Sequence, residues 1–303
     1  MPTATIRATL GGTLLLMSVL VSASATQSMS LPAEHPNSQR ISVQTHGSGA
    51  DVILIPGLAS SREVWADLAS GLRKSHRIHL VELAGFASTP AIANPDGKVI
   101  APAVDAIADY IQSQHIKAPV IIGHSLGGEI AIMLAARHPD LVGRLMIVDA
   151  LPFYMLMIDP AAISETAAPR ATATRDWLLG LSPEQMAEFQ KTSIARLAKT
   201  ESERPALVTA GINSDRKTVA DAVYELMITD LRPELGRIKA PIEVMYAYDT
   251  LFGIPAASVD AMYRQAYASA PDIHFTRIDN SFHFIMLDQP ERFSNEVESF
   301  LNQ

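Results

Sequence analysis

Short apolar runs alternate with longer segments of helical periodicity along much of the chain. The runs have the length of buried strands, and the longer segments carry apolar residues three or four positions apart. Strands are predicted at residues 51–55, 77–81, 119–122, 144–148, 241–246 and 272–278, with an edge strand at 41–45. Helices are predicted at residues 62–74, 99–115, 129–137, 256–269 and 290–301. This alternation predicts an α/β fold with a mostly parallel central sheet and helices on both of its faces.

The pattern changes between residues 150 and 239, where helical segments occur without a convincing strand. These segments lie near residues 170–179, 183–199 and 215–230. Ser182-Pro183-Glu184 and Ser214-Asp215 are typical helix starts, because a Ser or Asp side chain can accept a hydrogen bond from the first turn. The sequence therefore predicts a core formed by residues 26–149 and 240–303, with an inserted helical cap at 150–239.

Residues 1–25 have the three parts of a secretory signal peptide. Arg7 supplies the basic start, residues 10–21 form a short apolar stretch, and Ala23-Ser24-Ala25 fits the small-residue cleavage site. We expect cleavage after Ala25 and a periplasmic or secreted protein without a stable membrane span. The alternative is a segment that is kept as an N-terminal anchor, although its apolar run is short for a bilayer.

Composition excludes several classes of function. The 303 residues include 32 acidic and 24 Lys or Arg side chains, and no basic cluster stands out, so we expect no nucleic-acid partner. The chain has no cysteine and therefore no disulfide or thiol nucleophile. Its nine histidines are scattered without the spacing of metal ligands, so we expect neither a metal nor a cofactor.

The hexapeptide Gly123-His124-Ser125-Leu126-Gly127-Gly128 lies between a predicted strand and a predicted helix. In that setting G-x-S-x-G is the signature of a nucleophile elbow, a strained turn that presents a serine at the top of a sheet. The residues two before and two after the serine must be small, and both are glycine. We predict that Ser125 is a nucleophile and that His124 packs beside it.

An exposed serine needs a base, and the base needs a third group that fixes its tautomer. His283 lies in the loop after the strand predicted at 272–278, and Asp249 follows the strand predicted at 241–246. The chain order Ser, Asp, His is the order expected when a nucleophile elbow is followed by its acid and base in this kind of α/β architecture. We therefore predict a Ser125–His283–Asp249 triad. Asp149, at the end of the preceding strand, is the alternative acid.

With these residues the chain resembles the α/β-hydrolase superfamily across most of its length. The resemblance is carried by segments 53–61, 121–142, 241–255 and 281–293. It implies that the backbone N–H groups of Leu58 and Leu126 form an oxyanion hole. The chain departs from the family pattern with Pro56 where a histidine is common, which affects the loop more than the backbone donor.

The predicted cap opens with a strongly apolar run, residues 151–158, that either lines a substrate cleft or packs cap on core. If it lines a cleft, Phe153, Tyr154 and Met157 are candidate pocket residues and the substrate has a hydrophobic part. We expect a serine carboxylesterase that acts on a small ester-like molecule. An amidase, a peptidase or a carbon–carbon bond hydrolase would use the same triad, and a non-catalytic binding protein on this fold is the remaining alternative.

Overall fold

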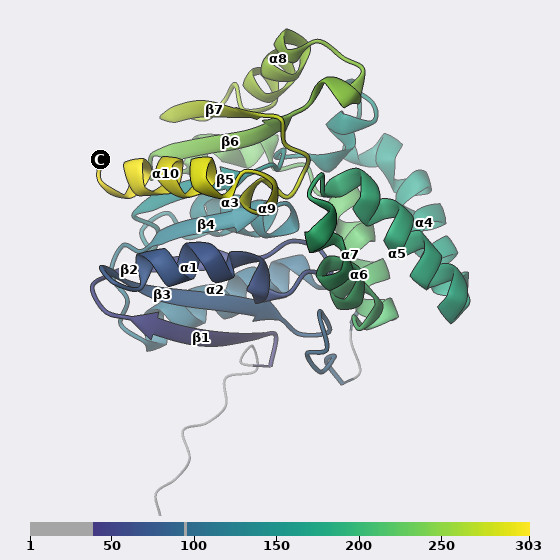
Figure 1. Cartoon of the computed structure of the whole chain (residues 1–303), viewed down its shortest axis with the longest axis horizontal. Coiled ribbons are helices and arrows are strands. Elements are labelled where there is room, and N and C mark those ends of the chain that lie inside the picture. The colour runs from purple at the N-terminus through teal and green to yellow at the C-terminus, as the bar shows by residue number, and fades with distance from the viewer. Residues whose placement is uncertain (1–38, 94–95) are drawn as a thin grey trace, which may run out of the picture. The chain divides into compact units, whose positions relative to one another are not determined.

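The computed structural model describes residues 39–93 and 96–303, so the predicted signal peptide lies outside the described residues. A seven-stranded sheet of order β1-β3-β2-β4-β5-β6-β7 forms the centre (Figure 1). β1 pairs antiparallel with β3, and the other neighbours pair in parallel. The strands are β1 (Ile41–Gly47), β2 (Ala50–Ile55), β3 (His76–Leu83), β4 (Val120–His124), β5 (Arg144–Val148), β6 (Ile242–Tyr248) and β7 (Ile273–Asp279). The prediction of a mostly parallel sheet with an edge strand near residue 41 is confirmed.

Helices cover both faces of the sheet, as predicted. Strand residues alternate between the faces: Ile53 and Ile55 pack with one helical layer, whereas Val52 and Leu54 pack with the other. The first layer contains α2 (Ile100–Ser113), α3 (Leu126–Arg137) and α8 (Ala256–Ala266). The second layer contains α1 (Ala66–Leu72), α9 (Ile285–Asp288) and α10 (Pro290–Leu301) (Figure 1). Both faces of the central strands are therefore buried, which explains their continuous apolar runs.

The helix predicted at residues 62–74 is shorter and less regular than expected. It begins with a 3-10 turn, η1 (Arg62–Trp65), and continues as α1. The Arg62 side chain is buried and forms an ion pair with Glu82 at an N–O distance of 2.8 Å. A buried charge needs such a partner, so this ion pair ties the turn to β3.

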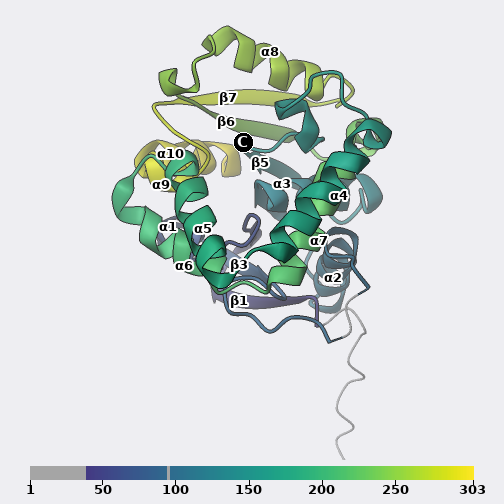
Figure 2. The same cartoon turned by 90° about the vertical axis from the view of Figure 1, so that its right-hand side faces the viewer.

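The chain between β5 and β6 is helical, and residues 149–241 contain no strand. Its helices are α4 (Ser164–Gly180), α5 (Pro183–Leu197), α6 (Arg204–Ile212) and α7 (Arg216–Ile228), with 3-10 turns η2 (Tyr154–Met157), η3 (Glu201–Glu203) and η4 (Arg232–Arg237). Figure 2 faces this group of helices. We call residues 150–239 the cap.

Local signals explain most of the cap boundaries. Ser182 caps α5 and exchanges hydrogen bonds with Gln185, and Asp215 caps α7. α4 begins at Ser164, before the predicted residue 170, and it contains Pro169 in its second turn, where a proline normally weakens a helix. α6 was not predicted, since its nine residues are too short for a clear periodicity. Within residues 39–93 and 96–303, no helix has the length and apolar character needed to cross a membrane.

Candidate active site

Ser125 lies at a sharp turn between β4 and α3. Its backbone has φ 54° and ψ −121°, a conformation that costs energy for any residue with a side chain. A Cβ atom on Gly123 would lie 2.1 Å from the Gly127 carbonyl oxygen, and one on Gly127 would lie 2.3 Å from the Ile55 carbonyl oxygen. Neither contact is sterically possible. The turn is therefore the strained elbow that the sequence predicted, and both glycines are required by its geometry.

The loop after β2 packs against this elbow. A Cβ atom on Gly57 would lie 3.1 Å from the Ser125 Cβ atom, so the loop backbone is in van der Waals contact with the serine. Leu58 lines the cavity next to Ser125. Leu126 is the first residue of α3, where a backbone N–H has no partner within the helix. The predicted oxyanion donors therefore lie on the two segments that flank Ser125, and their catalytic role stays a prediction.

The acid that contacts His283 is Asp149. His283 Nδ1 lies 2.7 Å from Asp149 Oδ2. The other carboxylate oxygen, Oδ1, accepts hydrogen bonds from the Ala247 backbone N–H at 2.9 Å and from the Tyr263 hydroxyl at 3.0 Å. Because a carboxylate only accepts hydrogen bonds, Nδ1 of His283 carries the proton of the neutral ring, and Nε2 keeps its lone pair.

The prediction that Asp249 orients His283 is therefore wrong. Asp249 forms an ion pair with Lys199 at 2.6 Å and accepts a hydrogen bond from the Leu251 backbone N–H at 2.9 Å. The Lys199 ammonium holds the pKa of Asp249 below its usual value. Asp249 thus serves as the cap of the short helix η5 (Thr250–Phe252) and as a partner for a cap lysine.

The backbone at the ends of two neighbouring strands explains why Asp149, and not Asp249, contacts His283. β5 and β6 pair in parallel, so Asp149 and Asp249 both follow a strand at the same edge of the sheet. Asp149 has a φ of 47°, an uncommon value that kinks the chain immediately after β5. Asp249 has an extended φ of −141°. The sequence places both carboxylates at this edge, but only the fold shows which of them contacts His283.

His124 supports the loop that carries His283. It is fully buried, its Nε2 donates to the His283 carbonyl oxygen at 3.0 Å, and the two ring centroids are 4.5 Å apart. Burial first, and the nearby His283 second, lower the pKa of His124 well below its ordinary value. His124 is therefore a neutral packing residue, as predicted, that also holds the His283 backbone.

Asp288 joins the same loop to the cap. Its carboxylate accepts backbone hydrogen bonds from Phe282 at 2.8 Å, from Lys199 at 3.1 Å and from Thr200 at 2.8 Å. The end of α5 and the His283 loop are thus fastened to one side chain. Asp288 and Tyr263 were not predicted as site residues, because both act through tertiary contacts that no local sequence pattern reveals.

A cavity of about 510 Å³ brings the candidate residues together between the sheet edge and the cap. Ser125, His283 and Asp149 all line it. Among the described residues, the Ser125 hydroxyl and the His283 ring do not form a hydrogen bond with each other. Catalytic hydrogen bonds often tighten only when substrate is bound. The cap contributes mainly apolar walls, from Trp177, Leu178, Phe189, Ile194, Val219, Val223, Leu226 and Met227.

The apolar run that opens the cap divides between cavity and core. Tyr154 and Met157 line the cavity, as predicted. Phe153 does not: it is fully buried in the core, under the Arg232 guanidinium at 5.4 Å. Its assignment as a pocket residue is therefore wrong, because the 3-10 turn η2 points neighbouring side chains in different directions.

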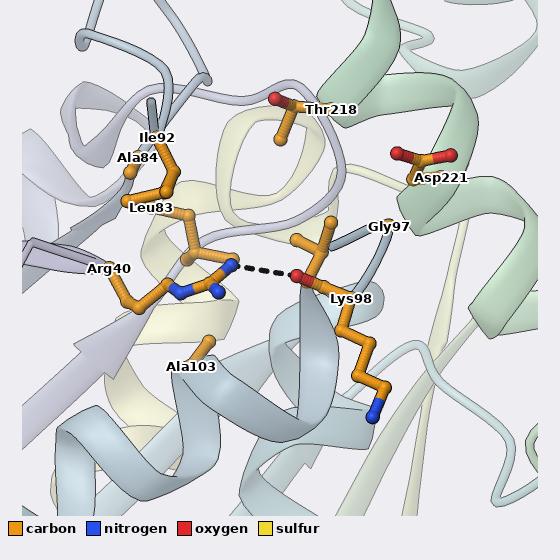
Figure 3. A pocket seen from close by; sticks show the side chains of 10 residues that line it. Arg40, Leu83, Ala84, Ile92, Gly97, Lys98, Ala103, Thr218 and Asp221 are labelled. Carbon is orange, nitrogen blue, oxygen red and sulfur yellow. Dashed lines mark hydrogen bonds between the residues drawn. The ribbon is translucent and has the colours of Figure 1, made fainter. Parts of the chain in front are cut away.

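Two other hollows are poorer candidates. The one in Figure 3, lined by Arg40, Lys98, Thr218 and Asp221, has about 20 Å³, room for roughly one water molecule. Arg40 donates to the Lys98 carbonyl oxygen across it (Figure 3). The other, about 370 Å³, lies at the starts of β6 and β7, the edge opposite to Ser125. Within the described ranges no group of three His, Asp or Glu side chains could hold a metal ion.

Fold and site together define a class of protein. A strained serine between strand and helix, a His–Asp pair at the same edge of a parallel sheet and a helical cap above them are the parts of a nucleophile-elbow enzyme. The family model described as alpha/beta hydrolase fold matches residues 52–210, and the chain belongs to this family.

Known proteins similar to this chain include esterases and a lactonase. A protein of Aeromonas salmonicida named pimeloyl-[acyl-carrier protein] methyl ester esterase is 28% identical, over 86% of this chain and 99% of its own. The enol-lactonase from Burkholderia xenovorans LB400 has a similar structure, with a TM-score of 0.70 and 19% identity over 87% of this chain and 96% of its own. A thermophilic esterase from Thermogutta terrifontis has a TM-score of 0.70 and 20% identity, over 86% and 93% of the two chains.

Proposed function

We propose that this protein is a serine hydrolase that cleaves carboxylic esters through an acyl-enzyme. The observation that carries the proposal is the 2.7 Å contact between His283 and Asp149 in the cavity that Ser125 also lines. This contact assigns the proton to Nδ1 and leaves Nε2 of His283 free to accept the serine proton.

The proposed mechanism has two half-reactions. Nε2 of His283 takes the Ser125 proton as Oγ attacks the ester carbonyl, and the backbone N–H groups of Leu58 and Leu126 stabilise the oxyanion. Collapse of this intermediate breaks the C–O bond, and the imidazolium protonates the leaving alcohol. A water molecule, deprotonated by His283, then attacks the acyl-enzyme and releases the acid and Ser125. Asp149 keeps its negative charge throughout and stabilises the imidazolium.

The cavity walls support a substrate with an apolar part. The Trp177 and Phe189 rings meet edge to face at 5.0 Å and border the cavity from α4 and α5. Apolar walls with few polar groups are typical of small-molecule sites. The pimeloyl-[acyl-carrier protein] methyl ester esterases and the enol-lactonase, by their names, support an ester over an amide.

We also propose that the protein is exported and cleaved after Ala25. The intact mass and N-terminal sequence of the protein recovered from the periplasm or medium should begin at Thr26. Retention of residues 1–25 on a membrane-bound form would contradict this proposal.

Kinetics on a panel of p-nitrophenyl esters and acyl anilides test the proposed activity. Ser125→Ala should lose ester hydrolysis by a factor of about 10⁴ or more, since the nucleophile is removed. Ser193→Ala is the matched control, because it also removes a serine hydroxyl, but from the cap wall of the same cavity. Equal turnover by wild type and Ser125→Ala would refute the proposal, and faster cleavage of anilides than of esters would refute the ester preference.

A further inference from the structure

Glu129 is a buried acid in the wall of the catalytic cavity that the proposed mechanism does not use. It lies on α3, one helical turn beyond Ser125, and is 1% exposed. It lines the cavity, and its Oε2 atom has no hydrogen-bond partner among the described residues. α3 is otherwise formed by buried apolar and glycine residues up to Ala136, so a lone acid there is a signal visible in the sequence.

Its surroundings favour the neutral acid. Burial is the main cause that raises the pKa of Glu129 well above its ordinary value, and the negative charge of Asp230 acts in the same direction. A hydrogen bond from the Tyr154 backbone in η2 acts in the opposite direction but is smaller than the effect of burial, and the buried Tyr267 from α8 also faces Glu129. In the described part of the chain, no Lys or Arg forms an ion pair with it. A protonated carboxyl group has an O–H donor, and a buried donor needs an acceptor.

We propose that Glu129 is a specificity-determining residue that donates a hydrogen bond to an oxygen acceptor carried by the apolar part of the ester substrate. The acceptor would be an ether, keto or hydroxyl oxygen in the acyl chain or in the alcohol. This inference depends on the proposed function in one respect: the molecule that carries the oxygen is the ester attacked by Ser125. It narrows the substrate class from plain alkyl esters to oxygen-bearing ones.

Matched pairs of esters test this inference. Each pair has equal chain length, and one member replaces a single CH₂ by an ether oxygen at a defined position of the acyl chain or of the alcohol. Ether oxygens accept hydrogen bonds and cannot donate them, so the pair isolates a donor in the protein. The readout is the ratio of kcat/KM for the ether ester to kcat/KM for the alkyl ester. The two esters also differ in intrinsic reactivity, but this difference is the same for every enzyme variant, so a change in the ratio between variants reports on the protein.

At one ether position, this ratio should fall about tenfold in Glu129→Leu, because the bound oxygen loses its donor. Glu129→Gln should retain most of the ratio, since its amide N–H₂ also donates. If the ratio falls only for esters with the ether oxygen in the acyl chain, Glu129 contacts the acyl group. If it falls only for esters with the oxygen in the alcohol, Glu129 contacts the alcohol. A ratio that is unchanged in Glu129→Leu at every position, or that falls equally in Glu129→Gln, would overturn the proposal.

Binding measurements separate this inference from the proposed activity. In the Ser125→Ala background, the dissociation constants of the same pairs as uncleavable amides should show the same preference and the same loss in Glu129→Leu. An intact binding preference without any ester turnover by the wild type would support the role of Glu129 and refute the esterase. Ester turnover that depends on Ser125, without a preference for ethers, would refute the role of Glu129 alone.

Discussion

Replacement of Asp149 by Asn should inactivate the enzyme, whereas the same change at Asp249 should not. Oδ1 of Asp149 accepts from two donors, the Ala247 N–H at 2.9 Å and the Tyr263 hydroxyl at 3.0 Å. In Asp149→Asn the amide oxygen keeps these two contacts, so the NH₂ group occupies the position of Oδ2 next to His283. That group is a donor, which forces the His283 proton onto Nε2 and removes the lone pair that must accept the serine proton.

The expected loss is large because the wrong tautomer cannot act as a base. For a triad of this kind, a wrong-tautomer substitution costs on the order of 10⁴ in kcat, which corresponds to about 5.4 kcal/mol of transition-state stabilisation. Asp249→Asn removes the negative charge beside Lys199, which is 39% exposed. Asp249 itself is only 3% exposed, but an Asn side chain can still accept from the Leu251 backbone N–H and from Lys199, and neither group contacts His283. This variant should therefore retain kcat/KM within about threefold.

The assay is kcat/KM on one p-nitrophenyl ester, with circular dichroism and thermal unfolding as controls for the fold. Both variants conserve the size of the side chain, so the folded state should be retained. Near-wild-type activity of Asp149→Asn together with a loss of 10³ or more in Asp249→Asn would refute the assignment. That result would return the triad acid to the position predicted from the sequence.

Three further substitutions test the structural account. Gly127→Ala should lower the free energy of unfolding by about 3 kcal/mol, measured by urea titration, because the new Cβ atom would lie 2.3 Å from the Ile55 carbonyl oxygen. Gly180→Ala is the control, because a Cβ atom there would have open space around it. Asp288→Asn should weaken the loop that carries His283 and reduce kcat/KM about tenfold, and an unchanged value would show that the three backbone contacts do not position the base. Burial raises the pKa of Glu129 above its usual value of 4.5, so its contribution to stability is full below that pH and is lost as the pH rises towards the folded-state pKa. The unfolding free energy of Glu129→Gln relative to wild type should therefore increase from pH 5 to pH 8, by at most about 1.4 kcal/mol per pH unit, and a flat difference would contradict the raised pKa.

Local periodicity predicted most of the fold. The strand predicted at residues 144–148 and the helix predicted at 290–301 coincide with β5 and α10. β5 is buried along most of its length, so its residues form a continuous apolar run. α10 begins at a proline and buries one face, which gives its apolar residues helical spacing. α6 was missed because its nine residues, between the 3-10 turn η3 and Asn213, contain too few periodic positions.

The site was predictable where the chemistry is local and not where it depends on tertiary contacts. Ser125 is defined by the glycines around it, and His283 by its place after the penultimate strand. The choice between Asp149 and Asp249 depends on a backbone kink after β5 and on Lys199 from the cap, about 50 residues distant in sequence from Asp249. No pattern of spacing encodes either feature.

Covalent labelling with a fluorophosphonate probe is the most direct test of whether Ser125 is a nucleophile. We expect one adduct per chain, located by mass spectrometry on the peptide that contains Ser125. The adduct should be lost in Ser125→Ala, and Asp149→Asn should form it far more slowly than Asp249→Asn does. A wild-type protein that is not labelled, or a Ser125→Ala protein labelled at the wild-type rate, would contradict a nucleophilic Ser125.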